Sequence, residues 1–250
     1  MGLAGRIAVV TGGGRGIGAA CARRLAEAGA RVVVFDRERT AVAAEVGALD
    51  VDCDLLDATS IDAAIARVRR EAGEPAILVQ SAGIGESAPF AETSDEIWNR
   101  AMALNATAPF RLARALVPAM IAARWGRVVN VASIAGLVGQ AYVAAYCASK
   151  HALVGLTRAM AAELAKTGVT VNAVCPGFVD TEMTQRTIAN IVQKTKRTPE
   201  EARKSLEAMN PQKRLIQPEE VADMVAVLCG EGARGINGQA IPIDGGQVMS

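Results

Sequence analysis

Tyr146 and Lys150 are the residues of this sequence whose types and spacing most clearly suggest acid–base chemistry. Tyr146 is one of only two tyrosines, and Lys150 follows it by four positions, so a helix would place both on one face. A free phenol has a pKa of about 10 and is a poor base at neutral pH. A neighbouring ammonium favours the phenolate and lowers that pKa, which predicts a general acid or base at Tyr146. Such a pair also arises by chance.

A second candidate is the glycine-rich turn from Thr11 to Gly18, which follows an apolar segment and precedes a helical pattern. Glycines let the main chain approach a pyrophosphate, which then lies at the positive N-terminus of the helix. A flexible surface loop is the alternative interpretation. The strand pattern before the turn and the helix pattern after it favour a dinucleotide site.

Asp36 ends the next apolar segment, 18 positions beyond Gly18. An acidic residue about 20 positions after such a turn binds the hydroxyls of an adenosine ribose. Its carboxylate would repel a 2′-phosphate, so we expect NAD as the cofactor in preference to NADP. Arg15 and Arg37 are nearby cations that could weaken this preference.

Short apolar segments alternate with longer helical patterns along most of the chain, which predicts a parallel sheet covered by helices on both faces. We expect one domain over residues 1–250 with a doubly wound, Rossmann-like α/β fold of about seven strands. The expected strands are 6–11, 31–36, 49–53, 76–80, 127–133, 170–175 and 239–243, and the expected helices are 17–28, 60–71, 95–123, 142–166 and 219–230.

The composition excludes several classes of function. The chain has 250 residues with 27 Lys and Arg against 26 Asp and Glu, which argues against a nucleic-acid binder. It contains no apolar run long enough to span a membrane and no signal-peptide pattern, so we expect a cytoplasmic protein. The five cysteines form no C-x-x-C pair and there is a single histidine, so we expect neither a disulfide framework nor a metal site.

One segment, 184–214, interrupts the alternation of strands and helices. It is polar, has helical propensity, and carries eight basic residues against three acidic ones. It could be a mobile lid that attracts an anionic substrate, or a solvated helical pair with no role in binding.

The order of these motifs resembles the short-chain dehydrogenase/reductase family. The resemblance runs from Arg6 to the closing Ile243-Asp244-Gly245-Gly246. It rests on the glycine turn and on Asp54, Asn105, Ser133, Tyr146 with Lys150, and Pro176-Gly177 ahead of Thr181.

The resemblance implies a role for each matching residue. Tyr146 would transfer the proton, and Ser133 would orient the carbonyl or alcohol. Lys150 would bind the nicotinamide ribose and lower the pKa of Tyr146, and Asn105 would hold a water linking Lys150 to solvent. Asp54 would contact the adenine, Ile17 with Ala82 and Gly83 the middle of the cofactor, and Val179 with Thr181 the carboxamide. The other expected cofactor residues are Gly12, Arg15, Gly16, Gly18, Leu55, Pro176 and Gly177. The family also implies a homotetramer paired through the helices at 95–123 and 142–166.

The chain departs from the family pattern after the fourth expected strand. The usual Asn-Asn-Ala-Gly is replaced by Gln80-Ser81-Ala82-Gly83. The second Asn of that pattern ties neighbouring strands together, and Ser81 has a shorter reach. We expect a local loss of stability here without loss of activity.

The predicted reaction is hydride transfer between nicotinamide and a secondary alcohol or ketone. The basic segment and the stretch from Asn210 to Leu215 favour an anionic or CoA-linked 3-hydroxyacyl or 3-oxoacyl substrate. A small aryl or alkyl alcohol is the alternative, with an apolar lining of Ile134, Leu137, Val138, Val143 and Phe178. A non-catalytic dinucleotide-binding protein would be expected to lose Tyr146 or Lys150. A sugar-nucleotide epimerase generally needs a larger C-terminal region.

Overall fold

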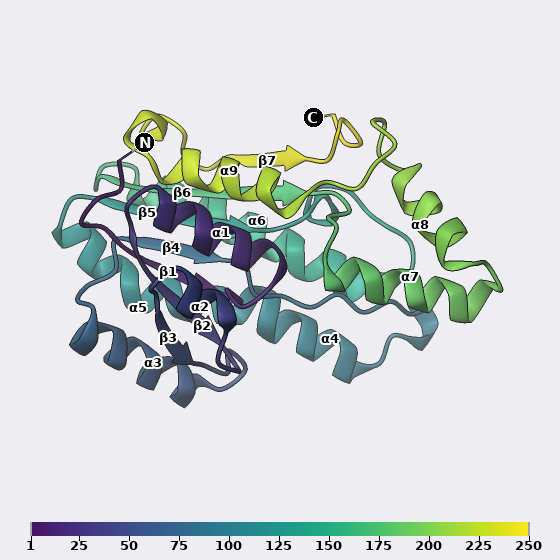
Figure 1. Cartoon of the computed structure of the whole chain (residues 1–250), viewed down its shortest axis with the longest axis horizontal. Coiled ribbons are helices and arrows are strands. Elements are labelled where there is room, and N and C mark those ends of the chain that lie inside the picture. The colour runs from purple at the N-terminus through teal and green to yellow at the C-terminus, as the bar shows by residue number, and fades with distance from the viewer. Residues whose placement is uncertain (1, 250) are drawn as a thin grey trace.

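The computed structural model describes residues 2–249 and contains one seven-stranded sheet in the order β3-β2-β1-β4-β5-β6-β7 (Figure 1). Every pairing between neighbouring strands is parallel. The strands are β1 (Ile7–Thr11), β2 (Arg31–Asp36), β3 (Leu49–Asp52), β4 (Ile77–Gln80), β5 (Gly126–Val131), β6 (Val169–Pro176) and β7 (Ala240–Ile243). The predicted fold class is confirmed, and all seven expected strands are present.

The helices that connect and cover these strands begin and end close to the predicted positions, with the exceptions described below. They are α1 (Gly16–Glu27), α2 (Ala41–Glu45), α3 (Ala58–Glu71), α4 (Asp95–Met102), α5 (Ala108–Ala122), α6 (Ala144–Leu164), α7 (Glu182–Thr195), α8 (Pro199–Glu207) and α9 (Pro218–Cys229).

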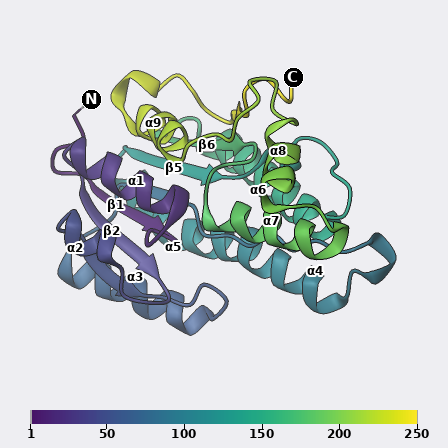
Figure 2. The ribbon, with the colours of Figure 1, turned by 45° about the vertical axis from the view of Figure 1, so that its right-hand side comes forward.

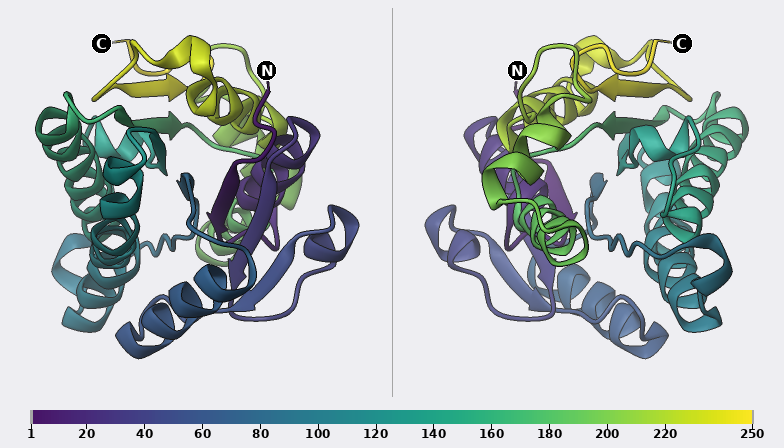
Figure 3. Two further views of the ribbon diagram at one scale, coloured as in Figure 1. Left: turned by 90° about the vertical axis from the view of Figure 1, so that its left-hand side faces the viewer. Right: turned by 90° about the vertical axis from the view of Figure 1, so that its right-hand side faces the viewer.

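The helices form two layers, one on each face of the sheet (Figure 3). On one face, side chains of α1, α2 and α9 pack with residues such as Val10, Val34 and Val174. On the other face, α3, α5 and α6 pack with residues such as Val9, Leu78 and Val128. Neighbouring residues of one strand, Val9 and Val10, therefore lie in different cores, which explains why the strands read as continuous apolar segments.

The chain changes direction across the sheet between β1 and β4. The strands β1, β2 and β3 extend from this point to one edge, and β4 to β7 extend to the other. In open α/β sheets, ligands bind beyond the carboxyl ends of the strands at such a switch point. The glycine turn follows β1 directly, so it lies at this position.

The predicted helix at 95–123 is divided in two. A π-helical segment, Ala103–Thr107, separates α4 from α5 and contains the buried side chain of Asn105. The widened turn has no signature in the hydrophobic periodicity, and such segments occur frequently at functional sites. The short helix α2 was also missed. Thr40 caps its N-terminus, because the Thr40 hydroxyl accepts a hydrogen bond from the Ala43 amide.

The basic segment 184–214 forms most of α7 and all of α8. Both helices stand beyond the carboxyl ends of the strands, at the end of the molecule where α4 also projects (Figures 1 and 2). α8 begins with a reciprocal capping box, in which Thr198 and Glu201 bond to each other's main-chain amides. Within residues 2–249, no helix is long and apolar enough to cross a membrane.

Candidate active site

A groove of about 250 Å³ opens beside the carboxyl ends of β1, β2 and β4. Its walls come from five parts of the chain: the glycine turn, the ends of β2 and β3, the loop after β4, the end of α4 with the π-helical segment (Arg100 and Leu104), and the start of α7. The predicted cofactor residues that line it are Gly12, Arg15, Gly16, Ile17, Gly18, Asp36, Asp54, Leu55, Ala82, Gly83 and Thr181.

The glycine turn has the shape that a diphosphate requires. Gly12 and Gly16 have positive φ values of 62° and 53°, which side-chain-bearing residues rarely adopt. A Cβ at Gly18 would collide with the carbonyl oxygen of Gly12. The main chain at the start of α1 is therefore not covered by side chains, and no side chain caps the first amides of this helix. These groups fit the pyrophosphate of a dinucleotide.

Each oxygen of the Asp36 carboxylate accepts a main-chain hydrogen bond. Its Oδ2 accepts a hydrogen bond from the Gly14 amide at 3.0 Å, and its Oδ1 accepts one from the Arg37 amide at 2.8 Å. Asp36 therefore stabilises the glycine turn directly. The side chains of Arg15 and Arg37 line the same part of the groove, so the local charge is not purely negative.

Arg15 joins the glycine turn to the start of α7. Its Nη1 atom lies 3.2 Å from Oε2 of Glu182, and both side chains are largely exposed to solvent. An exposed ion pair of this kind contributes little to stability. The pair does link the glycine turn on one side of the groove to α7 on the other.

Tyr146 and Ser133 lie close together just beyond the carboxyl end of β5. Ser133 follows β5 and its hydroxyl accepts a hydrogen bond from the Ala135 amide at 3.1 Å. Removal from water raises the pKa of Tyr146, and a hydrogen bond with Ser133 acts in the opposite direction. In the protein itself the phenol therefore keeps its proton at neutral pH.

Lys150 is 4% exposed and its Nζ donates a hydrogen bond to the Val131 carbonyl oxygen at 2.8 Å. Nζ lies 5.7 Å from the centre of the Tyr146 ring. Burial lowers the pKa of Lys150 to about 8, because a charged ammonium is poorly solvated there. From sequence, only the favourable charges of Lys150 and of an oxidised nicotinamide beside a phenolate were expected, and the burial of Lys150 was missed.

Asn105 is held in one orientation by three hydrogen bonds. Its Oδ1 accepts from the Ile84 amide at 2.9 Å, and its Nδ2 donates to the Ile84 carbonyl at 2.8 Å and to Oγ of Ser149 at 2.9 Å. The Ser149 hydroxyl in turn donates to the Tyr146 carbonyl at 2.8 Å. Ser149 is fully buried and was missed by the sequence argument, although it lies between Tyr146 and Lys150.

Gln80 compensates for the missing asparagine of the family pattern. Its Nε2 donates to Oδ1 of Asn130 on β5 at 2.9 Å, and Asn130 donates to Thr157 on α6 at 2.8 Å. The tie between strands thus starts one position earlier than expected. The amides of Ser81 and Ala82 both donate to Oγ1 of Thr11. The side chain of Gln80 leaves its buried Oε1 without a partner in the described structure, so the compensation is incomplete.

The residues after β6 are placed less directly on the groove. Gly177 donates its amide to the Ile243 carbonyl at 3.0 Å, and a Cβ there would press on Asp244. Pro176 is the last residue of β6, and Val179 is 5% exposed and packs in the core. Of the four predicted positions at and after the end of β6, Thr181, the N-cap residue of α7, lines the groove, and Glu182 and Met183 line it beside Thr181.

The apolar residues suggested for an aryl substrate belong to different packing clusters. Leu137 packs against Leu153 and Val154, whereas Phe178 packs against residues of α7 and α8. Ile134 is buried and Val138 is partly exposed.

Comparisons with known proteins agree with this architecture. The sequence profile of the family described as enoyl-(acyl carrier protein) reductase matches residues 12–247. The 3-oxoacyl-[acyl-carrier-protein] reductase of Pseudomonas aeruginosa is 35% identical and that of Escherichia coli K12 is 34% identical, each over 100% of both chains. The chain belongs to the short-chain dehydrogenase/reductase family. It is therefore an oxidoreductase of that family.

A solved structure corrects the predicted cofactor. The chain is similar to a phenylalanine-to-tryptophan variant of actinorhodin polyketide ketoreductase solved with NADPH, with 38% sequence identity, a TM-score of 0.93 and 97% coverage of both chains. The preference for NAD inferred from Asp36 is wrong on this comparison, which points to NADP. The physical reason lies in Arg15 and Arg37, which line the groove beside the carboxylate, because two cations there offset its repulsion of a 2′-phosphate.

Proposed function

We propose that this short-chain dehydrogenase/reductase reduces a 3-oxoacyl thioester to the 3-hydroxyacyl thioester with NADPH. The observation that carries the proposal is the meeting of Tyr146, Ser133 and Lys150 beside a groove with a bare glycine turn. The relatives named as 3-oxoacyl-[acyl-carrier-protein] reductases support the substrate class, and the NADPH-bound ketoreductase supports the cofactor.

When bound, NADPH would supply a hydride to the carbonyl carbon of the substrate, and the protein supplies alignment and a proton. Ser133 donates a hydrogen bond to the substrate carbonyl oxygen and orients it. Tyr146 donates its phenolic proton to the same oxygen, and this proton together with a hydride on the carbonyl carbon converts the C=O bond into a CH–OH group. A proton on Tyr146 at neutral pH suits this direction, because the phenol must be an acid for reduction.

Lys150 and Asn105 then return the proton. The ammonium of Lys150, held at the Val131 carbonyl, lies one helical turn from Tyr146 and can contact the nicotinamide ribose. Asn105 faces this group: a Cβ at Gly83 would lie 3.1 Å from Asn105 Oδ1 and 3.4 Å from Lys150 Nζ. A water held near Asn105 would connect Lys150 with solvent.

The cofactor residues divide the groove between them. Arg15 and Arg37 offer positive charge to the 2′-phosphate, and Asp54 with Leu55 contacts the adenine. Gly12, Gly16, Ile17 and Gly18 receive the pyrophosphate. Ala82 and Gly83 face its centre, and Val179 with Thr181 contacts the carboxamide, supported from behind by Pro176 and Gly177.

The wider organisation is part of the same proposal. The proposal assigns one catalytic domain to residues 1–250, with the segment 184–214 as a substrate lid. It also places the protein in the cytoplasm, where its five free thiols would stay reduced. Homotetramer formation through α4, α5 and α6 is supported by the partly exposed side chains of Trp98, Phe110 and Ile121 on the first two helices. Light scattering coupled to size-exclusion chromatography tests the oligomeric state.

The deciding experiment follows NADPH oxidation by absorbance with acetoacetyl-CoA, acetoacetate and an uncharged aryl ketone, with NADH in parallel. We expect acetoacetyl-CoA with NADPH to give the highest kcat/KM. A higher kcat/KM for the aryl ketone would contradict the acyl substrate. Equal rates with both cofactors would contradict a role for Arg15 and Arg37 in phosphate binding.

A further inference from the structure

The segment that carries α7 and α8 returns to its own starting point. Val179 and Ile216 form an isolated parallel bridge, in which Asp180 donates its amide to the Ile216 carbonyl and Ile216 donates to the Phe178 carbonyl, both at 2.9 Å. These residues, 178–180 and 216, are called the neck below. The neck includes Val179 and precedes Thr181, the two residues proposed to contact the nicotinamide carboxamide.

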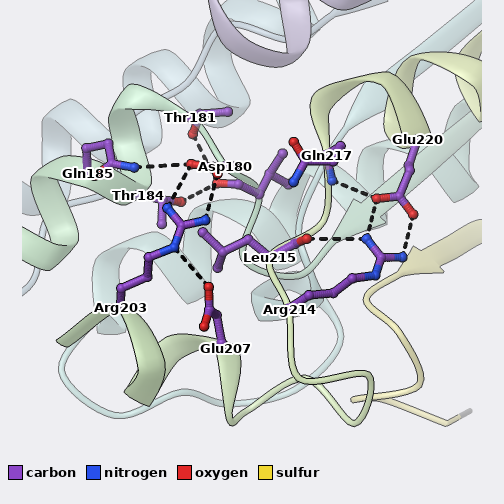
Figure 4. A network of polar contacts seen from close by, with 11 residues as sticks. Asp180, Thr181, Thr184, Gln185, Arg203, Glu207, Arg214, Leu215, Gln217 and Glu220 are labelled. Atoms are coloured by element: carbon purple, nitrogen blue, oxygen red, sulfur yellow. Dashed lines mark hydrogen bonds and ion pairs between the residues drawn. The ribbon is translucent and has the colours of Figure 1, made fainter. Parts of the chain in front are cut away.

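An ion pair connects the neck with α8. Nη2 of Arg203 lies 2.8 Å from Oδ2 of Asp180, and Nη1 lies 3.5 Å from Oδ1, so the guanidinium faces the carboxylate with its forked end (Figure 4). Gln185 on α7 donates to the same carboxylate at 3.1 Å. Asp180 therefore holds both lid helices at a single side chain.

The pair keeps its charges at neutral pH. The hydrogen bond from Arg203 lowers the pKa of Asp180, and the carboxylates of Asp180 and Glu207 raise the pKa of Arg203. The Nε atom of Arg203 also lies 2.9 Å from Oε1 of Glu207, one turn further along α8. The Nε, Nη1 and Nη2 atoms of Arg203 thus all donate to carboxylate oxygens.

The apolar side of the lid fixes α8 to the same elements. Ala202 and Leu206 of α8 pack with Ile188 of α7 and with Leu215 beside the neck, and each of these side chains is buried. A displacement of α8 would break this small core or carry α7 and the neck with it. Because packed cores move between discrete arrangements, the neck and α8 are expected to move together.

We propose that Arg203 is a positioning residue that couples the lid helix α8 to the cofactor-binding residues at the neck. When the cofactor binds and orders Val179 and Thr181, this order would be transmitted through Asp180 to α8, which belongs to the proposed substrate lid. Reciprocally, a substrate that holds α8 closed would tighten cofactor binding. This inference rests on the proposed function, in which the neck contacts the nicotinamide end.

The test is amide hydrogen exchange of the full-length protein with and without NADPH, read in peptides covering 199–207. In the wild-type protein we expect NADPH to slow exchange in α8 by about fivefold or more, the lower end of common coupling factors. Arg203→Gln should abolish this protection, and Arg203→Lys should retain part of it. Glu207→Gln is the matched control, because it removes a partner of the same guanidinium but leaves the pair with Asp180 intact.

Protection of α8 in Arg203→Gln equal to that in the wild-type protein would overturn the inference, as would loss of protection in Glu207→Gln to the same degree. Absence of protection in the wild-type protein would overturn it as well. Thermal unfolding of each variant checks that the fold is retained, and Asp180→Asn gives a second variant that removes the pair from the other side.

Turnover of acetoacetyl-CoA with NADPH, measured on the same samples, reports on the proposed function separately. Turnover in a protein whose α8 is not protected by NADPH would support the proposed function and refute the coupling through Arg203. With coupling present, Arg203→Gln should raise KM for the thioester by about fivefold and change kcat little, since the proton-transfer groups are untouched.

Discussion

The Lys150 ammonium donates a hydrogen bond to the carbonyl oxygen of Val131, the last residue of β5, at 2.8 Å. A helix side chain thus satisfies a strand-end carbonyl next to Ser133. The position of the ammonium is fixed by the main chain of the sheet and does not depend on a carboxylate. A buried amine without a countercharge is held at an energetic cost, which has a measurable pH dependence.

The first prediction concerns stability at alkaline pH. Lys150 has a pKa of about 8 in the folded protein against the ordinary 10.5. Between these values the unfolded chain still binds the proton that the folded protein has released, so the contribution of Lys150 to the unfolding free energy rises with pH. Relative to Lys150→Met, the wild-type protein should gain about 3 kcal/mol between about pH 7.5 and pH 10.5. Urea unfolding of both proteins measures this, and a constant difference would contradict the lowered pKa.

The second prediction is that Tyr146→Phe abolishes turnover while leaving NADPH binding nearly unchanged. The phenol is the proposed proton donor, and general acid catalysis contributes about 10²- to 10⁴-fold. Steady-state kinetics and fluorescence titration of NADPH give the two quantities. Tyr142→Phe is the matched control, because Tyr142 is the other tyrosine and is 69% exposed. Activity retained in Tyr146→Phe would refute the proposed proton transfer.

The third prediction concerns Ser149, whose hydroxyl links Asn105 to the Tyr146 carbonyl. Ser149→Ala leaves one buried donor of Asn105 unpaired, which should cost about 1–3 kcal/mol of stability. If Ser149 also keeps Asn105 oriented for the proton relay, kcat should fall and its pH profile should shift.

The control for Ser149 is Thr157→Val on the same helix. The Thr157 hydroxyl accepts from Asn130 at 2.8 Å and donates to the Leu153 carbonyl at 2.8 Å, so its loss is chemically similar. It lies away from Tyr146 and should lower stability without changing the pH profile. Equal pH profiles in the two variants would leave Ser149 with a structural role alone.

The sequence predicted the fold well, because the sheet depends on patterns that are local. Seven apolar segments and the glycines that follow helices specified strands β1 to β7 and their flanking helices. What sequence patterns could not supply is the pairing of side chains distant in the chain. The tie from Gln80 to Asn130 and the pair between Arg203 and Asp180 depend on the packed structure.

The cofactor error has the same physical origin. An acidic residue at the end of β2 predicts NAD from its type and position, but its effect on a 2′-phosphate depends on the charges around it. In this protein Arg15 and Arg37 line the groove beside Asp36. The π-helical segment around Asn105 was missed because one continuous helix was predicted over 95–123, and a single widened turn is not recognised from helical periodicity.

The fourth prediction tests the side chain of Arg37, which lines the groove beside Asp36. Arg37→Ala should weaken NADPH binding by about tenfold and NADH binding much less, because only NADPH carries the 2′-phosphate. Arg39→Ala is the control, since Arg39 is a neighbouring exposed arginine of the same charge. Dissociation constants for both cofactors, measured at one ionic strength, decide the outcome. An equal effect on NADH and NADPH would rule out contact with the phosphate.

The last prediction concerns the basic side chains of the lid that form no ion pair and could therefore attract an anionic substrate. Of the eight basic residues in 184–214, Arg186, Arg203 and Arg214 form ion pairs with carboxylates, and Lys213 donates to a main-chain carbonyl. The other four, Lys194, Lys196, Arg197 and Lys204, form no ion pair within residues 2–249. The first three follow one another closely where α7 ends, before α8 begins.

Replacing these three with glutamine should therefore raise KM for acetoacetyl-CoA by about threefold to tenfold and leave KM for an uncharged ketone unchanged, because only the CoA thioester carries phosphates to attract. The effect on the thioester should shrink as salt is added, since exposed charges are screened within about 10 Å at 0.1 M ionic strength. A loss that is equal for both substrates, or independent of salt, would mean that the lid acts through its shape and that its positive charge has no part in binding.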